Sequence, residues 1–266
     1  AEGHSGMVFR ASFVPSCVCA NCILTASADG SIMLWKMDNG HAPIRIAWPH
    51  AKGCSGDYAG VTFAAFSGDG SFLVTSSNDG EASIWSVHSG TCIRTLRYGS
   101  NFFPHSYGKF VRSRNSLSLS SSGRRLVTAC ADGTTKVWDL ASGSRVQKFG
   151  SPFHCLEFEF CSCGAIAENE DMVLGILPDR RNQGTCNVEL WSITMGDCIQ
   201  RYSHGGDDEA ELRVDDLVQV AFSADFQYVL STVNCNVKIW SVGTGECVQT
   251  LQIGGFTVMT AAAFLT

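Results

Sequence analysis

The sequence predicts an all-β chain in which a small antiparallel sheet of four strands is repeated five times. Two periodic features of the 266-residue chain predict this fold class. Tryptophans that end similar short apolar runs recur every 49 to 53 residues, at Trp35, Trp85, Trp138, Trp191 and Trp240. Large apolar residues recur in step with them, at Phe13, Phe66, Leu119, Phe160, Phe222 and Phe264. Two series in register indicate an internal repeat.

Each repeat consists of short segments that alternate apolar with polar residues and are rich in β-branched and aromatic side chains, which is typical of strands. We name the four strands a to d in chain order. In the second repeat they are expected at residues 61–66, 71–76, 82–85 and 92–96. Asp-Gly pairs that end at Gly30, Gly80 and Gly133 fit tight hairpins between strands b and c, because glycine tolerates positive φ.

A sheet of this size cannot bury both faces by itself, so consecutive sheets are expected to stack radially as blades of a β-propeller. We expect five complete blades and the first strand of a sixth, with boundaries at 3–50, 58–98, 110–150, 152–203, 216–253 and 256–266. The interval from Phe160 to Trp191 is 31 residues, against 18 to 22 in the other repeats. This difference predicts an insertion within residues 161–185 of the fourth repeat.

These motifs resemble the WD-repeat β-propeller family over essentially the whole chain. The matching features are Gly3-His4, the Phe-Ser-x-x-Gly run that begins at Phe66, the Asp-Gly pairs before three of the tryptophans, and Trp138-Asp139. The resemblance implies a hydrogen-bonded cluster of hydroxyl, aspartate, tryptophan and histidine in each complete repeat. The implied members are His4, Thr25, Asp29 and Trp35, then Thr75, Asp79 and Trp85, then Thr128, Asp132 and Trp138.

The last two repeats depart from this pattern. At the aspartate position they carry Thr185 and Asn234, so these two blades are expected to be held mainly by apolar stacking. The family resemblance also implies a ring of usually seven blades. We therefore expect a fragment that lacks about two blades, with a tight ring of five blades as the alternative.

Three of the connections from strand d to the next strand a are long, at residues 48–60, 98–114 and 202–216. In a propeller these loops emerge on one face together with the b–c hairpins, and loops on a rigid scaffold often carry function. Simple length drift of surface loops is an equally open reading. The candidate partner-binding residues in these loops are Tyr58, Phe102, Phe103, His105, Tyr107, Arg112, Asp207, Asp208 and Glu209.

The sequence carries no recognised catalytic or cofactor motif, so we expect no enzyme activity, no catalytic residues and no cofactor. The seven histidines are scattered over different repeats, away from any nucleophile motif. The acidic run at residues 207–216 lacks the central glycine and distal glutamate of a calcium loop, which favours a solvated loop.

Thirteen cysteines without a secretory signal indicate reduced, mostly buried thiols. Cys17, Cys19 and Cys22, with Cys161 and Cys163 at the matching place in the fourth repeat, could suggest zinc. Their separation by three blades favours structural thiols and no metal. A last group recurs at the start of strand d, which indicates packing residues: Cys92, Cys198 and Cys247.

The function expected from these features is a non-catalytic scaffold that binds peptides or protein partners within a multi-subunit complex. The alternative is a recognition module of a chromatin or ubiquitin-ligase complex, and an enzyme is the least favoured class. A net charge of −6, with basic residues such as Arg124 and Arg125 on different faces, makes nucleic acid an unlikely partner. No signal peptide or membrane span is visible, so an intracellular, cytoplasmic or nuclear location is expected.

Overall fold

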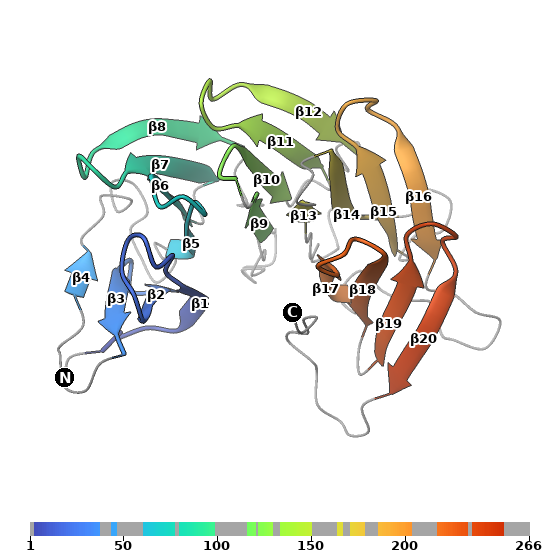
Figure 1. Ribbon diagram of the computed structural model, residues 1–266, viewed down its shortest axis with the longest axis horizontal. Helices are drawn as coiled ribbons and strands as arrows, with labels where there is room; N and C mark the ends of the chain where they lie inside the picture. The colour runs from blue at the N-terminus through green and yellow to red at the C-terminus, as the bar shows by residue number, and fades with distance from the viewer. Residues whose placement is uncertain are drawn as a thin grey trace, which may run out of the picture. The chain divides into compact units, whose positions relative to one another are not determined.

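The structure, a computed structural model, describes twelve segments of the chain. They are residues 3–37, 44–46, 61–77, 80–98, 116–120, 122–129, 134–150, 164–166, 171–178, 186–203, 217–233 and 236–252. These segments hold five antiparallel sheets of four strands each and no helix (Figure 1). The predicted all-β chain of five four-stranded blades is therefore confirmed.

Within every blade the four strands are hydrogen-bonded in chain order. Blade 1 contains β1 (Val8–Phe13), β2 (Cys22–Ser27), β3 (Ile32–Lys36) and β4 (Ile44–Ile46). Blade 2 contains β5 (Val61–Phe66), β6 (Phe72–Ser77), β7 (Glu81–Ser86) and β8 (Cys92–Arg97). Blade 3 contains β9 (Ser116–Leu119), β10 (Arg125–Ala129), β11 (Thr135–Asp139) and β12 (Arg145–Phe149).

The remaining two blades have the same order. Blade 4 contains β13 (Gly164–Ile166), β14 (Met172–Pro178), β15 (Cys186–Ser192) and β16 (Cys198–Ser203). Blade 5 contains β17 (Leu217–Phe222), β18 (Tyr228–Val233), β19 (Asn236–Ser241) and β20 (Cys247–Gln252). The strands expected in the second repeat are all found, each within one residue at either end. The expected sixth-blade strand at 256–266 lies outside the described residues.

The repeat extends to the local irregularities of the sheets. In blades 2 to 5 the pairing of strands c and d shifts register at the tryptophan of each repeat, as at Trp85 and Trp240. Strand a is likewise irregular near its start in blades 1, 2 and 5. Such bulges bend and twist a strand, so the blades that share a bulge share the same local bend.

The fourth repeat aligns differently from the sequence-based expectation. Each tryptophan lies opposite a strand-b residue that in turn lies opposite the last apolar residue of strand a, as in Trp85–Leu73–Phe66. In blade 4 this row is Trp191–Val173–Ile166. The repeating position is therefore Ile166, and the assignment of Phe160 was wrong. Val173 precedes Trp191 by 18 positions, whereas Leu73 precedes Trp85 by only 12. The extra residues of the fourth repeat therefore lie in strands b and c and in the connection between them.

The chain divides into two compact units, and each has its own core. The first unit comprises residues 1–103, 119–126 and 139–144. Its core joins strands of blades 1 and 2 through apolar residues such as Leu24, Ile32, Val61 and Leu73. The second unit comprises residues 104–118, 127–138 and 145–266, and its cores join blades 3 and 4 and blades 4 and 5.

Within each unit, strand d of one blade also holds the c–d turn of the next. In the first unit the Arg94 guanidinium donates hydrogen bonds to the carbonyl oxygens of Ala141 and Ser142. In the second, the Gln200 side chain lies against Gly245 in the same way. Gly245 has a φ of +74°, and a Cβ there would collide with Gln200. Glycine is thus required twice over, by backbone conformation and by the approach of the neighbouring blade.

Candidate functional site

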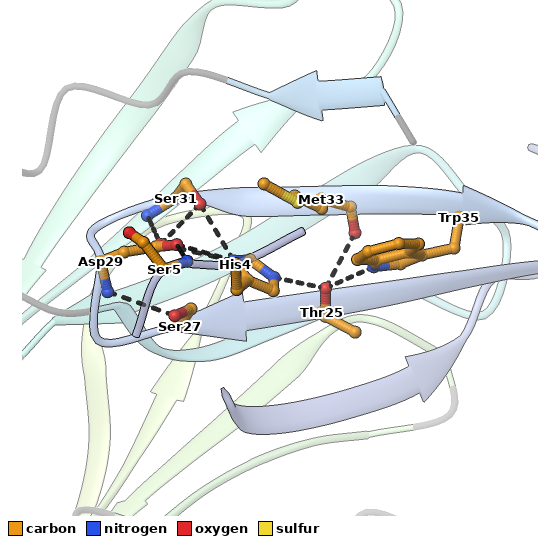
Figure 2. Close-up of polar contacts among 8 residues, drawn as sticks. All are labelled: His4, Ser5, Thr25, Ser27, Asp29, Ser31, Met33 and Trp35. Atoms are coloured by element: carbon orange, nitrogen blue, oxygen red, sulfur yellow. Dashed lines mark hydrogen bonds and ion pairs between the residues drawn. The ribbon is translucent and has the colours of Figure 1, made fainter. Parts of the chain in front are cut away.

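The most developed polar cluster of the molecule lies in blade 1 (Figure 2). His4 precedes β1, Thr25 lies on β2, Asp29 lies in the β2–β3 hairpin and Trp35 lies on β3. The structure brings these four predicted residues together. The Trp35 Nε1–H donates to the Thr25 hydroxyl at 2.7 Å, the His4 Nε2 lies 2.7 Å from the same hydroxyl, and the His4 Nδ1 lies 3.1 Å from Asp29 Oδ2.

The chemistry of the partners fixes the direction of this chain. The Asp29 carboxylate can only accept, so the His4 Nδ1 carries the hydrogen. In neutral imidazole Nε2 then accepts from the Thr25 hydroxyl, which lies nearer to it, at 2.7 Å, than to the Met33 carbonyl oxygen at 3.4 Å. The Thr25 oxygen in turn accepts from Trp35. The His4 and Asp29 side chains are only 4% and 5% exposed. The arrangement has the order of a hydroxyl–histidine–aspartate triad, but burial and Trp35 close the hydroxyl to a substrate, so the cluster acts as a structural brace.

Two residues that sequence reasoning missed complete the cluster. The Ser31 hydroxyl donates to Asp29 Oδ1 at 2.6 Å, and the backbone N–H of Ser5 donates to Oδ2 at 2.9 Å. Burial alone would raise the pKa of the Asp29 carboxyl group. The hydrogen bonds from Ser31, Ser5 and His4 outweigh burial, so the pKa of Asp29 lies well below its ordinary value. Asp29 is therefore held as a carboxylate.

Three further blades keep the tryptophan–hydroxyl hydrogen bond. The Nε1–H groups of Trp85, Trp138 and Trp240 donate at 2.7 to 2.9 Å to Thr75, Thr128 and Ser231 respectively. Asp79 and Asp132 lie outside the described residues. In blade 5, Ser231 was missed because it precedes its tryptophan by nine residues instead of ten. Trp240 therefore has a polar partner that the sequence pattern did not predict.

Blade 4 alone lacks this bond among the described residues. The strand-b position that carries Thr25, Thr75 or Ser231 elsewhere is Gly175, two residues beyond Val173. The Trp191 Nε1 is buried and has no hydrogen-bond partner. The indole instead stacks on Phe149 of blade 3, with ring centroids 5.0 Å apart. Apolar contact is thus what supports Trp191.

The cysteines of the described segments do not follow the sequence-based expectation. Cys19 and Cys22 form a disulfide in the β1–β2 turn, with Cα atoms 5.7 Å apart, so these two are not reduced thiols. Cys92, Cys198 and Cys247 are exposed. They begin the outermost strand of their sheets, where side chains meet solvent, so their interpretation as packing residues was wrong. No group of three metal-ligating side chains occurs in the described segments, while Cys161 and Cys163 lie outside them.

The predicted partner-binding residues all lie outside the described part of the chain: Tyr58, Phe102, Phe103, His105, Tyr107, Arg112, Asp207, Asp208 and Glu209. Only the edges of two long loops are described. Tyr98 and Tyr202 are fully buried, and the Tyr98 hydroxyl donates to the carbonyl oxygen of Ser77 at 3.2 Å. Both tyrosines therefore anchor the loop ends in the blades. In the described segments no helix is long and apolar enough to cross a membrane.

Repeated four-stranded blades with a tryptophan–hydroxyl bond on strands b and c define a repeat protein of the β-propeller class. Comparison with protein-family models agrees, because the WD domain, G-beta repeat model matches residues 1–36, 50–86 and 90–139. The chain therefore contains WD repeats within residues 1–139.

Curated relatives carry the same type of repeat. The guanine nucleotide-binding protein subunit beta of Zea mays is 26% identical over 222 residues, which cover 78% of this chain and 50% of the relative. The U3 small nucleolar RNA-associated protein 21 homolog of Schizosaccharomyces pombe is 25% identical over 76% of this chain and 23% of its own length. The COMPASS component SWD3 of Saccharomyces cerevisiae is 28% identical over 55% of this chain and 42% of its own length. The chain thus spans half or less of each of these relatives.

Proposed function

We propose that this chain is a non-catalytic scaffold that binds protein partners through the end of its blades where strand d leads to strand a. We call this end the loop end, and the end with the a–b and c–d turns the turn end. The observation that carries the proposal is the nature of the relatives. One is named as a subunit of a guanine nucleotide-binding protein and another as a component of COMPASS. Both names describe parts of assemblies, and a cytoplasmic or nuclear location is part of the proposal.

The architecture supports this role. Arginine, glutamine and aromatic contacts between neighbouring blades keep the sheets rigid, and the buried tyrosines Tyr98 and Tyr202 fix the ends of two long loops. Loops held by a rigid frame lose little conformational entropy when they bind. The polar cluster of blade 1 is closed to solvent, which favours binding over catalysis as the use of this fold.

The test is affinity purification of the full chain with identification of its partners. Two variants decide which end of the blades is used. Shortening residues 98–114 alters the loop end, and the double substitution Arg124→Ala with Arg125→Ala alters the turn end of blade 3. We expect partners to be lost from the first variant and kept by the second. The reverse result would place the binding surface at the turn end.

A recognition module of a chromatin complex is the second candidate, and the similarity to a COMPASS component favours it. Such a module would bind histone-derived peptides when isolated from the other subunits. Binding of the purified chain to a panel of basic histone-tail peptides would support this candidate, and absence of binding would leave the general scaffold role.

A further inference from the structure

The inner strands of the first two blades bring an arginine onto an aromatic ring. β1 and β5 contact each other within the first unit. Arg10 and Phe63 occupy equivalent positions on them, each directly after the irregularity at the start of strand a. The guanidinium carbon of Arg10 lies 5.3 Å from the centroid of the Phe63 ring. Since strand a begins at the loop end, this pair lies on the side that the proposed function assigns to partners.

Arg10 is an exposed charge beside a buried ring. Phe63 is 4% exposed, so the ring forms part of the protein interior, whereas Arg10 is exposed. At the same time, burial lowers the pKa of the Arg10 guanidinium. Solvent therefore reaches the Arg10 side chain, while the neighbouring protein partly desolvates its charge. Electrostatic attraction to an incoming anion is stronger in such a place than on a flat surface.

The guanidinium of Arg10 has no acceptor among the described residues, which distinguishes it from Arg94, Arg97 and Arg201. Arg97 pairs with Glu81 and Arg201 pairs with Glu189, at 2.8 and 2.7 Å. Arg94 donates to backbone carbonyl groups of the neighbouring blade. The Phe63 ring attracts the Arg10 charge through its π face but offers no hydrogen-bond acceptor. The N–H donors of Arg10 are therefore available to an acceptor on a partner.

We propose that Arg10, oriented by Phe63, binds a carboxylate group of an acidic segment of a protein partner. The planar fork of a guanidinium matches the two oxygens of a carboxylate, and the charge-assisted pair is stronger than a neutral hydrogen bond. A basic segment would meet a like charge at this position. The proposal rests on the scaffold function and narrows its partner class to chains that present acidic side chains to the loop end.

The experiment measures binding of fluorescein-labelled hexaglutamate to the full chain by fluorescence anisotropy at low salt. We expect Arg10→Ala to weaken binding about tenfold or more. Arg10→Lys keeps the charge but loses the fork, so its affinity should lie between the two. Phe63→Leu keeps an apolar contact but removes the ring, and should also weaken binding. Arg124→Ala is the matched control, because it removes an exposed arginine from the turn end, and it should bind normally.

Several outcomes would overturn the proposal. These are no binding of hexaglutamate by the unmodified chain, equal loss in Arg10→Ala and Arg124→Ala, and full affinity in both Arg10→Lys and Phe63→Leu. Thermal unfolding of every variant shows which of them are folded. If Arg10→Ala does not fold, the affinity of Arg10→Lys tests the proposal in its place. Tighter Arg10-dependent binding of labelled oligothymidylate than of hexaglutamate would assign the site to nucleic acid and refute the carboxylate. If hexaglutamate fails while affinity purification returns stable partners, the scaffold function stands and only the Arg10 site is lost.

Discussion

Blades 1 and 4 solve the same packing problem in different ways. In blade 1 the tryptophan ends a buried chain of hydrogen bonds that runs from Trp35 through Thr25 and His4 to Asp29. In blade 4 the indole of Trp191 has no polar partner and lies against Phe149. The strand order and the row of paired residues are nevertheless the same. The contrast indicates that apolar packing of the tryptophan maintains the blade and that the polar network is added to it.

The polar groups of blade 4 are rearranged around Gly175. Glu189 lies directly opposite it on β15, is buried, and accepts a hydrogen bond from Arg201 Nε at 2.7 Å. Thr135 of blade 3 approaches from the other side, with its hydroxyl 3.0 Å from where a Gly175 Cβ would lie. At the position of Thr135 the other blades carry Ile32, Ala82, Val188 and Val237. The Thr135 hydroxyl thus occupies the space beside Gly175, but it makes no hydrogen bond with the described residues and does not replace the missing partner of Trp191.

The largest expected effect tests the role of packing. Trp138 is buried, so Trp138→Ala should destabilise the chain by about 3–5 kcal/mol. Trp191 is partly buried against a core cluster, so Trp191→Ala should cost an amount toward the lower end of the same range. Chemical denaturation of the two variants measures this, with Met195→Ala as a control because Met195 is 74% exposed. A Trp191 effect no larger than that of the control would mean that the stacking on Phe149 contributes nothing.

The second effect depends on pH and concerns blade 1 alone. Asp29→Asn removes charge-assisted hydrogen bonds and should cost about 1.5–3 kcal/mol near neutral pH. Since the folded-state pKa of Asp29 is lowered, its contribution is present above the unfolded pKa of about 3.9 and is lost as pH falls through the folded value. Thermal unfolding of both proteins from pH 7 down to pH 2 should show the difference shrinking below about pH 4. A difference that is constant with pH would refute this assignment.

A third pair of variants isolates the hydrogen bond itself. Trp35→Phe and Trp191→Phe make the same change of ring, but only the first removes a hydrogen bond and leaves the Thr25 hydroxyl without its donor. We expect Trp35→Phe to be the more destabilising by about 1 kcal/mol. The comparison is a difference between two free energies of unfolding, so the common loss of ring volume largely cancels. Equal effects would show that the Trp35–Thr25 contact is energetically neutral.

Much of the fold was predictable because periodic residues carry it. The tryptophan series located strand c in every blade, and the strands of the second repeat were placed to within a residue. The assignment of Phe160 failed because two apolar candidates, Phe160 and Ile166, both precede strand b, and only the observed pairing of Ile166 with Val173 separates them. Periodicity gives spacing, whereas register is fixed by cross-strand contacts.

The candidate sites were less predictable than the fold. Motif matching located His4, Thr25 and Asp29. It missed Ser231, because the spacing of Ser231 from its tryptophan differs by one residue. It also missed Gly175, because a glycine at the hydroxyl position carries no side chain to match. Arg10 also carries no motif. Its importance arises only when β1 and β5 place it on the ring of Phe63, a contact between residues more than 50 positions apart. Local sequence does not encode such a neighbour.

The smallest expected effect concerns the contact between Gly175 and the Thr135 hydroxyl of the neighbouring blade. Gly175→Ala should gain about 0.4–1 kcal/mol from the less flexible unfolded chain, because no positive φ opposes the new side chain. The new Cβ would meet the Thr135 hydroxyl at 3.0 Å, a tight contact that offsets this gain. The single variant should therefore be close to neutral.

In a Thr135→Ala background the contact disappears, and the same substitution should become stabilising. A double-mutant cycle by chemical denaturation measures this coupling. Independent effects of the two substitutions would mean that Thr135 does not occupy the space that Gly175 leaves open.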